Sequence, residues 1–482
     1  MKKIFTSLKP GFWLLLGLGL LASCKKDYLT LPKPANSVEA EGAYANDDAI
    51  GPLLTGAYGA LKQSQTGTKG SNLLLALYAD EMVAVEDPFA ALDGEPSSVA
   101  VYSWKITPVN TAGKYFWPRL YNIIYICNGV LENVPNQSKL LYKNQWLGEA
   151  YFMRALAYYY LVNMYGNVAI ITSTNYKENI IVPRVAPAQA YSLMQADLKQ
   201  AISLLSPDYK DVSGKTTTAT NARTRPNQLA AKALLARVSL FTGQWQQAWD
   251  NADQVIKDTR YALQPRASIG NTFLATSREF ILEGDCDEDA RLFEAGGFPP
   301  PSNSLSSSLM SSFEPNDLRL KNWVRMDLNF LTGMMINLPS KYKSTIIGQP
   351  KLDRLPLLRL AEQYLIRAEA AAQLAKLGDA GKLASAITDL NAIRSRAGLG
   401  VTTAATPDAL LDAILKERRT ELFFEDGHRL FDLRRTGKLD AVMQQEMQTS
   451  RLGTGAKWES YKQYLPLTVN DNRAGLAQTP GY

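Results

Sequence analysis

Glu417, Glu421 and Glu425 recur at intervals of four residues, which places three carboxylates on one face of a helix. Paired carboxylates are the groups that glycoside hydrolases use as acid and as nucleophile or base. Stacked like charges cost about 0.2–0.5 kcal/mol per pair unless they are neutralised. Arginines that could neutralise them are frequent in the same region: Arg394, Arg396, Arg418, Arg429, Arg434 and Arg435. Because arginine binds carboxylates bidentately and joins helices, we predict structural ion pairs here rather than catalysis.

Asp285, Asp287 and Asp289 have the alternating spacing that opens a calcium-binding loop. An EF-hand is excluded, because the turn position that demands glycine is Ala290 and the final carboxylate position is Gly296. A solvated acidic loop is the favoured interpretation, and an irregular calcium site is the alternative.

Other catalytic groups are scarce. His428 is the single histidine, so a histidine-dependent triad or an imidazole-bound zinc centre can be built only if His428 serves. We expect His428 just past a helix end in a structural, capping or surface role. Gly214-Lys215-Thr216 imitates the end of a phosphate-binding loop, but its first glycine is replaced by Tyr209 and no helix is expected to follow. The sequence therefore predicts no catalytic residue, no metal centre and no cofactor.

Cys24 is the one cysteine with an evident chemical role. It follows Leu21-Ala22-Ser23, an apolar stretch from Gly11 to Leu21 and the basic Lys2 and Lys3. That order is typical of a secretory signal, and the stretch is about half the roughly 20 residues that cross a bilayer. Leucine, two small residues and cysteine resemble the bacterial lipobox, in which the thiol is acylated and becomes the first residue. Two or more acyl chains would anchor the mature protein stably.

Helical periodicity dominates the remainder. From Glu149 to Tyr165 apolar residues form one stripe, and Gly166 follows as a stop. Between Asn227 and Asp258, two helices meet at Gly243 with small alanines at the expected contacts, which matches the tetratricopeptide pattern. Two further segments, 362–377 and 382–397, form a similar pair. Thr406-Pro407 begins another helix. We predict a mainly α fold of stacked helix pairs.

Three long stretches lack this periodicity: 86–104, 212–225 and 283–318. Loops of this length in a compact protein are usually functional or disordered, so a ligand site would be built there. The 482 residues are 46% hydrophobic and 20% charged, which is typical of a globular chain. Three of the basic residues that make the net charge +6 lie in the leader, so nucleic acid is not an expected partner. Cys127, among isoleucines, is expected to be a buried small hydrophobe, although it could pair with Cys286 in an oxidising compartment.

Several blocks resemble the SusD/RagB family, in their order and spacing, over nearly all of the mature chain. The C-terminal blocks are 390–399 (LNAIRSRAGL), 417–422 (ERRTEL), 425–435 (EDGHRLFDLRR), 464–467 (YLPL) and 478–482 (QTPGY). Upstream, 117–121 (WPRLY) with Asn128, 154–158 (RALAY) and Tyr165-Gly166 are similar to its N-terminal half.

The resemblance implies a SusD-like α/α superhelical fold with minor β structure. It also implies a surface-exposed outer-membrane lipoprotein that lies over a TonB-dependent transporter barrel (SusC-like) and captures nutrient, usually an oligosaccharide. The charged Lys25, Lys26 and Asp27 resemble an export signal to the outer leaflet. The expected organisation is a signal peptide (1–23), an N-terminal half (24–226) and a C-terminal half (227–482), with both halves packed as one globular unit.

These blocks are scaffold, so ligand contacts must be chosen on physical grounds. Sugars stack on aromatic rings and need polar partners for their hydroxyls. The long loops supply candidates of both kinds: Asp87, Phe89, Trp104, Asp285, Arg291, Phe293 and Phe298. For each aromatic taken singly, the favoured interpretation is that it holds its own loop against the core. These loops hold few aromatic residues for a sugar platform, which keeps peptide capture open as an alternative.

The leading hypothesis is therefore glycan capture without catalysis. Peptide capture by the same architecture is the second, a surface glycosidase a less favoured third, and a tetratricopeptide adaptor that binds only protein the last.

Overall fold

The computed structural model describes residues 40–65, 70–84, 98–111, 116–217, 222–285, 303–329, 333–342, 353–471 and 476–482. The chain divides into two units, Met1–Ala43 and Tyr44–Tyr482. Within the first unit, α2 (Ala40–Ala43) is the described helix. All other elements belong to the second unit. Cys24 and the predicted signal peptide (1–23) lie outside the described residues.

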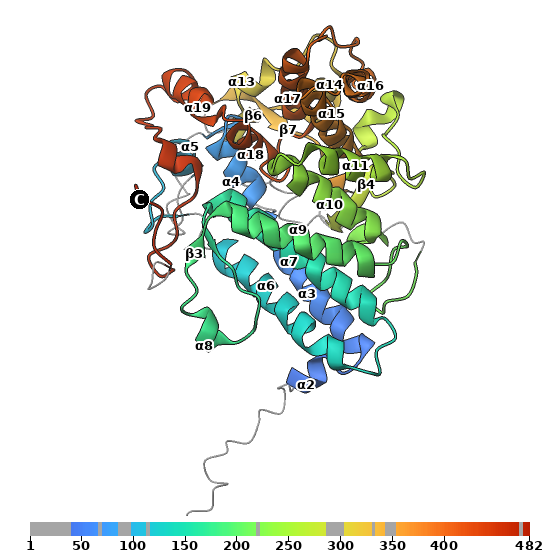
Figure 1. Cartoon of the computed structure of the whole chain (residues 1–482). Coiled ribbons are helices and arrows are strands. Elements are labelled where there is room, and N and C mark those ends of the chain that lie inside the picture. The colour runs from blue at the N-terminus through green and yellow to red at the C-terminus, as the bar shows by residue number, and fades with distance from the viewer. Residues whose placement is uncertain are drawn as a thin grey trace, which may run out of the picture. The chain divides into compact units, whose positions relative to one another are not determined.

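Helices dominate the second unit, as predicted (Figure 1). Those of the N-terminal part are α3 (Asp47–Gln65), α4 (Ser71–Tyr78), α5 (Ser98–Tyr102), α6 (Phe116–Asn133), α7 (Lys143–Tyr165), α8 (Tyr176–Asn179) and α9 (Pro187–Leu204). Those of the C-terminal part are α10 (Gln228–Phe241), α11 (Trp245–Ile256), α13 (Ser307–Met310), α14 (Leu318–Trp323), α15 (Leu360–Lys376), α16 (Gly381–Arg396), α17 (Pro407–Glu421), α18 (His428–Arg435) and α19 (Leu439–Gln448). Short 3₁₀ turns are η4 (Val134–Asn136), η5 (Ala222–Thr224), η6 (Arg266–Asn271) and η7 (Ser460–Gln463).

The α7 helix lies at the centre of the N-terminal part, with α3, α6, α9 and α10 packed around it. The predicted helix is confirmed, but the prediction of a single apolar stripe is wrong, because every residue from Phe152 to Tyr165 is buried. Neighbours on all sides of a central helix remove the need for a polar face. The helix ends at Gly166, whose φ is +71°, and a β-carbon there would lie 2.9 Å from the ring of Tyr464. Glycine therefore serves both the turn and the close packing.

The predicted helix pairs are confirmed. The α10–α11 pair turns at Gly243, whose φ is +69°, and α15–α16 turns at Gly378. Each pair contacts the next through α11 and α15, and α17 packs on α15. The α17 helix begins after Thr406, whose hydroxyl accepts a hydrogen bond from the amide of Ala409. Local caps and turns thus define a stack of helical hairpins.

Strands are few in the described residues. They form two-stranded antiparallel sheets: β1 (Met82–Ala84) with β5 (Asn303–Leu305), β2 (Val168–Ala169) with β3 (Arg184–Val185), β4 (Phe280–Asp285) with β8 (Arg354–Arg359), and β6 (Val324–Asn329) with β7 (Met334–Pro339). Parts of two predicted loops are therefore regular, including α5, β5 and α13. The Ser306 hydroxyl accepts a hydrogen bond from the amide of Leu309 and caps α13, a local signal that the loop prediction overlooked.

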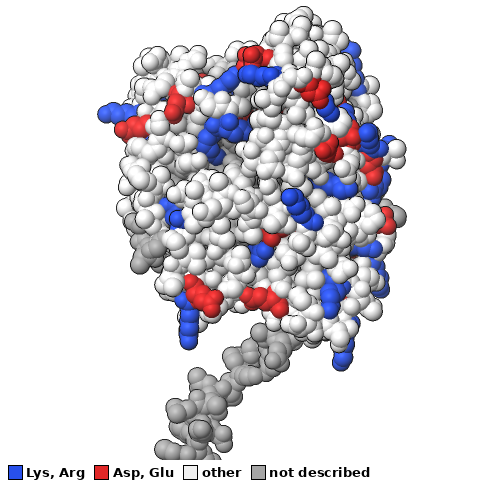
Figure 2. Space-filling view, viewed as in Figure 1, with Lys and Arg blue, Asp and Glu red and all other residues white. Residues whose placement is uncertain are grey.

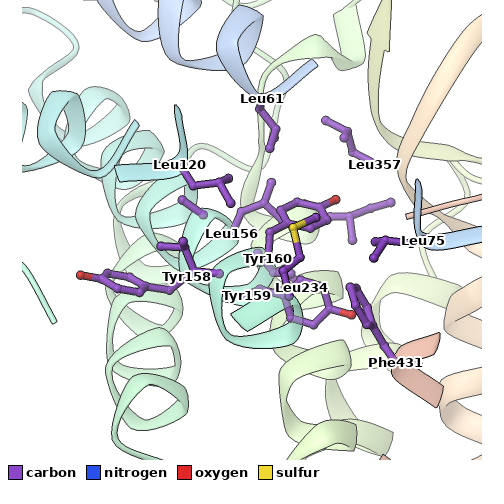
Figure 3. Close-up of a cluster of buried hydrophobic side chains, with 14 of the residues drawn as sticks. Leu61, Leu75, Leu120, Leu156, Tyr158, Tyr159, Tyr160, Leu234, Leu357 and Phe431 are labelled. Atoms are coloured by element: carbon purple, nitrogen blue, oxygen red, sulfur yellow. The ribbon is translucent and has the colours of Figure 1, made fainter. Parts of the chain in front are cut away.

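One large hydrophobic core joins the N-terminal and C-terminal helices of this unit. Leu61, Leu120 and Leu156 from the N-terminal helices meet Leu234 and Phe431 from the C-terminal ones (Figure 3). Cys127 lies in this core as predicted, and burial raises the pKa of its thiol to about 12. Within the described ranges, no helix combines the length and the apolar character that a membrane crossing requires.

Candidate functional site

Most of the ligand candidates chosen from the sequence fall in segments that the structure leaves undescribed. Asp87, Phe89, Arg291, Phe293 and Phe298 lie there, as do Cys286, Asp287 and Asp289. The backbone of Asp285 ends β4, while its side chain is outside the described part. Among the described residues, no group of three or more His, Cys, Asp or Glu side chains is placed to hold a metal ion.

Trp104 is described, and it holds its loop against the core. Its side chain is 1% exposed, and the indole N–H donates to the carbonyl of Tyr78 at 2.9 Å. The ring packs edge-on against Trp458, with their centroids 5.0 Å apart, and the guanidinium of Arg451 lies 4.0 Å from the ring centroid. This is the role favoured for each loop aromatic taken singly, so Trp104 does not offer an open stacking face to a sugar.

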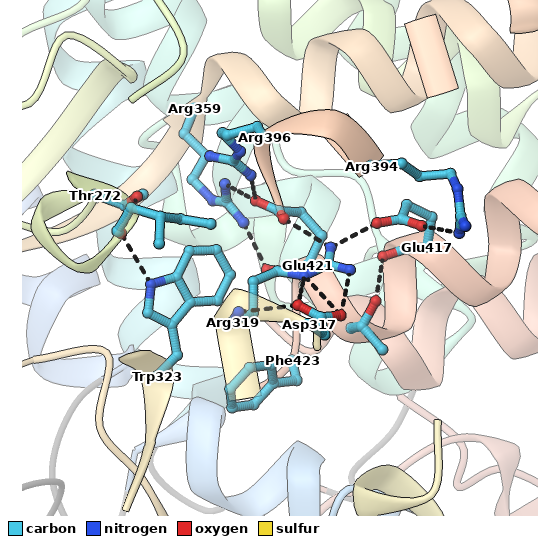
Figure 4. A network of polar contacts seen from close by, with 12 residues as sticks. Thr272, Asp317, Arg319, Trp323, Arg359, Arg394, Arg396, Glu417, Glu421 and Phe423 are labelled. Atoms are coloured by element: carbon cyan, nitrogen blue, oxygen red, sulfur yellow. Dashed lines mark hydrogen bonds and ion pairs between the residues drawn. The ribbon is translucent and has the colours of Figure 1, made fainter. Parts of the chain in front are cut away.

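The three glutamates that could suggest a glycosidase are bound by cations in the scaffold. Glu421 is fully buried between Arg319, Arg359 and Arg396, which approach it from α14, β8 and α16 (Figure 4). Burial alone would raise the pKa of Glu421, but these three guanidinium groups outweigh it and hold the pKa well below its usual range.

Its two neighbours in the series are paired in the same way. Glu417 contacts Arg319 at 2.6 Å and Arg394 at 3.3 Å. Glu425 lies beyond the end of α17 and pairs with Arg359 at 2.8 Å and with Lys341. The predicted ion pairs are confirmed, although they include Arg319, Arg359 and Lys341, which the local sequence did not indicate. The helical face was predicted to extend to Glu425, and this was wrong because α17 ends at Glu421.

His428 begins α18 rather than following the end of a helix. Gly427 precedes it at φ +70° as the residue before the first turn. The imidazole is 4% exposed, and burial together with Arg237 and Arg418 holds its pKa well below the usual range. A neutral core histidine agrees with the structural role but not with a capping role at a helix end. Gly214-Lys215-Thr216 forms a turn, in which Asp211 accepts hydrogen bonds from the amides of Ser213 and Lys215.

An open groove of about 470 Å³ lies beside α6, and we call it the aromatic groove. Pro118, Tyr121 and Tyr125 project from one face of α6 into it, because they are three or four residues apart. Tyr125 is 55% exposed and Tyr176, on α8, is 72% exposed. The residues that line the groove are Trp117, Pro118, Tyr121, Tyr125, Ala169, Ile171, Thr174, Tyr176, Asn179, Ile180, Asp471 and Leu476.

The far wall of the groove is the segment 169–180, which we call the wall segment. It projects from the helices as the loop that carries α8 (Figure 1). The hydroxyl of Tyr121 accepts from the amide of Ala169 and donates to its carbonyl, both at 2.9 Å. The hydroxyl of Tyr158 bonds the amide and carbonyl of Ile171 in the same way, at 2.7 and 3.1 Å.

Asn128 extends this attachment. Its amide nitrogen donates to the carbonyls of Ile171 and Ser173 at 3.1 and 3.3 Å. Its oxygen accepts from Arg154, which pairs bidentately with Asp197 on α9 at 2.7 and 2.8 Å. Side chains of α6 and α7 therefore fix the main chain of the wall segment, Asp197 of α9 holds Arg154 in place, and the groove is preorganised.

Two sequence families match this chain. One, described as "SusD family", matches residues 308–482. The other, described as "Starch-binding associating with outer membrane", matches residues 77–240. A SusD-like protein of Formosa agariphila is 26% identical, over 92% of this chain and 94% of its own length. The chain belongs to the SusD-like family.

Solved SusD-like structures have the same fold. A laminarin-binding SusD-like protein superposes with a TM-score of 0.72 and 25% identity, covering 91% of this chain and all of its own. A putative sugar-binding protein from Bacteroides vulgatus superposes with a TM-score of 0.70 and 25% identity, over 90% and 98% of the two chains. The mainly helical SusD-like fold inferred from the signature blocks is therefore confirmed.

In this SusD-like protein, residues of the N-terminal signature blocks line the aromatic groove or form hydrogen bonds to the wall segment. Trp117, Tyr121, Asn128, Arg154 and Tyr158 all belong to them, and each supports the groove or its wall. The signature blocks were interpreted as scaffold, with ligand contacts expected in the long loops. The signal that could have found the groove was Tyr121 and Tyr125 on one face of a helix, followed by aromatic and amide residues at 175–179.

A second cavity, of about 420 Å³, lies next to Trp104 and the C-terminal Tyr482. Lys105, Lys457 and Lys462 line it together with Tyr461. Two of these cations are already bound, since Lys105 donates to the carbonyl of Thr454 and Lys462 to that of Lys457. These two cavities thus differ in character, because aromatic residues line one and lysines line the other.

Proposed function

We propose that this SusD-like protein is a lipid-anchored protein of the outer-membrane surface. It binds an oligosaccharide and delivers it to a TonB-dependent transporter barrel of the SusC-like kind. The observation that carries the proposal is the match, over the whole length of that protein, to a laminarin-binding SusD-like structure. The family described as starch-binding and associating with the outer membrane supports the same ligand class and location.

The pairing of the carboxylates supports recognition without bond cleavage. Glu417, Glu421 and Glu425 are each paired with at least one arginine in the scaffold, and none is poised as an acid or a nucleophile. On the face in Figure 2, acidic and basic side chains are interspersed among neutral residues. That surface favours an uncharged ligand over nucleic acid.

Titration calorimetry with oligosaccharides and with peptides tests the ligand class. We expect micromolar to millimolar binding to at least one oligosaccharide and no hydrolysis of it on prolonged incubation. Binding to peptides, with no binding to any sugar, would favour the peptide-capture alternative. Release of shortened products by the purified protein would favour a glycosidase instead.

Cys24 provides the test of the anchor. Radiolabelled palmitate should be incorporated into the wild-type protein and not into Cys24→Ala, and the variant should leave the membrane fraction. Protease added to intact cells should degrade the wild-type protein if it faces outward.

The barrel partner is tested by purification. A tagged wild-type protein solubilised in detergent should carry a TonB-dependent barrel with it, encoded in a neighbouring reading frame. If the tagged protein is recovered without a barrel, the proposed ligand capture stands, but the proposed delivery to a transporter is contradicted.

The loop candidates remain part of the proposal. Phe89, Asp87, Asp285, Arg291, Phe293 and Phe298 are expected to add contacts around the bound glycan. Alanine at each position should weaken glycan binding several-fold if the loop takes part, and unchanged affinity at all six would remove the loops from the site.

A further inference from the structure

The aromatic groove exposes rings that nothing in the described part of the chain covers. Tyr125 and Tyr176 are more than half exposed, and neither hydroxyl has a hydrogen-bond partner among the described residues. Ile180 beside them is 53% exposed. Apolar surface gathered in a concavity with a few polar groups is typical of ligand sites.

We propose that the aromatic groove binds a neutral saccharide, with a pyranose ring lying against the rings of Tyr125 and Tyr176. The inference takes its ligand class from the proposed function and adds the place and the charge of the ligand. A pyranose with equatorial substituents presents C–H groups on its faces, and these pack on aromatic rings while its hydroxyls point to the rim. A volume of about 470 Å³ suits a short oligosaccharide segment rather than a single ion.

Hydrogen-bonding groups stand at the rim for those hydroxyls. The Oδ2 atom of Asp471 accepts from the hydroxyl of Thr468 at 2.6 Å, and its Oδ1 atom has no partner within the described ranges. The free phenol hydroxyls of Tyr125 and Tyr176 can donate and accept. These groups match the mixed donors and acceptors of a sugar.

The charge of the groove selects against acidic sugars. Among the described residues that line it, Asp471 is the one charged residue, and none is a lysine or an arginine. Arg184 stacks on Trp117, 5.9 Å from the ring centroid, but its nitrogens donate to the carbonyls of Asn167, Tyr165 and Ala477. A carboxylate that faces no cation among the described residues repels a uronate or a sulfate, whereas it accepts a hydrogen bond from a neutral hydroxyl.

The wall segment also disfavours an extended peptide in this groove. Peptides commonly add to a free strand edge through main-chain hydrogen bonds. Here the amides and carbonyls of Ala169 and Ile171 are already bonded to the hydroxyls of Tyr121 and Tyr158. The groove therefore presents rings and side chains rather than a strand edge, which suits a sugar.

The test is titration calorimetry on the purified full-length protein in detergent. One set of probes is neutral: laminari-, cello-, malto-, xylo- and manno-oligosaccharides. The other set is acidic: oligogalacturonate, alginate and chondroitin sulfate oligosaccharides. We expect binding to a neutral probe, weakened about tenfold by Tyr125→Ala and by Tyr176→Ala, as expected for a lost stacking contact of about 1.4 kcal/mol.

Two further variants separate stacking from folding. Tyr125→Phe keeps the ring and should bind within about threefold of the wild type. Leu377→Ala removes an equally exposed apolar side chain at the end of α15, outside the groove, and should bind as the wild type does.

The outcomes divide cleanly. Neutral-sugar binding that survives both tyrosine variants overturns the groove assignment and leaves the proposed function standing. Binding of acidic probes alone overturns the inferred neutrality of the ligand. If no sugar binds, both the inference and the proposed function are overturned.

Discussion

Arg451 lies in the core, and its guanidinium group serves main-chain carbonyls instead of a carboxylate. It donates to the carbonyls of Tyr102, Leu77 and Ala79, which end α5 and α4. The rings of Tyr102 and Trp104 lie 4.3 and 4.0 Å from it. Burial lowers the pKa of Arg451 to about 10, which leaves it charged at neutral pH. A cation at the carbonyl ends of two helices offsets both dipoles.

We therefore expect Arg451→Met to lower the free energy of unfolding by about 3 kcal/mol or more, because each carbonyl left without a donor costs about 1–3 kcal/mol. Urea denaturation followed by circular dichroism measures the change. Lys376→Met is the matched control, since Lys376 pairs with Asp408 at the surface, where such pairs contribute about 0–1 kcal/mol. Equal stability of the two variants would contradict the capping role.

Glu81 is a buried carboxyl next to a second one. Asp80 takes both nearby arginines, Arg429 at 2.7 Å and Arg419 at 2.8 Å. Burial would raise the pKa of Asp80, but these cations lower it to about 2. Burial and the charge of Asp80 raise the pKa of Glu81 to about 7, although the amide of Phe424 and the same two arginines oppose the rise. The folded protein thus holds a proton on Glu81 that the unfolded chain releases near its ordinary value.

This shift predicts a pH dependence of stability. The contribution of Glu81 is complete below about pH 4.5 and is lost as the pH rises through about 7, amounting to about 3 kcal/mol. Glu81→Gln stays neutral, so the difference in unfolding free energy between variant and wild type should grow in favour of the variant from pH 5 to pH 8. Urea titrations of both proteins at several pH values measure it. A difference independent of pH would refute the protonated Glu81.

At the scale of elements, helix ends were predictable because their signals are local. Gly243, Thr406-Pro407 and Gly166 mark the boundaries that the structure has. The strands were not predictable, since β1 pairs with β5 and β4 with β8 across long separations in sequence. The wall segment was missed for the same reason: its bonds run to side chains on α6 and α7 rather than to its neighbours along the chain.

Asn227 offers a test of a local signal. Its side chain caps α10 by accepting from the amide of Ala230 at 2.9 Å, and its nitrogen donates to the carbonyl of Pro207 at 3.2 Å. It is fully buried, so Asn227→Ala should cost about 2 kcal/mol. Thr406→Ala removes an exposed cap with a longer bond, 3.3 Å, and should cost about half as much. Thermal and urea unfolding rank the two, and the reverse order would show that burial does not set the cost.

At the scale of the molecule, polar bonds and the core both cross the boundary proposed between residues 226 and 227. Gln65 donates to Asp426 at 2.7 Å, Tyr78 donates to the carbonyl of Lys462 at 2.8 Å, and Asp80 pairs with Arg429. The hydrophobic core in Figure 3 draws on both halves. The halves were delimited from the sequence alone, and their packing as one unit remains a prediction.

We expect the mature chain to melt in one calorimetric transition, with the calorimetric and van't Hoff enthalpies in agreement. The fragments 24–226 and 227–482, made separately, should each fail to give a cooperative transition, because each would expose its side of the shared core. Differential scanning calorimetry tests both statements. Two resolved transitions, or a half that folds alone, would show that the halves are independent domains.

The groove proposed as the ligand site was not predictable from the spacing of residues along the chain. The candidates were sought in long loops, and the one aromatic among them that the structure describes, Trp104, is buried. Tyr125 lies in α6 and Tyr176 in α8, and only the folded chain brings these two helices to one groove. Spacing along a helix predicts which residues share a face, but it does not predict what lies opposite.

The attachment of the wall segment has an evolutionary consequence. Tyr121, Tyr158 and Asn128 bond the main-chain amides and carbonyls of the segment. Every residue type has these groups, except that proline lacks the amide hydrogen. Most side chains between Thr172 and Ile181 can therefore be substituted without loss of these main-chain hydrogen bonds. Under the proposed function, substitutions in this segment would change the sugar specificity of the groove without any change in the helices that hold the segment.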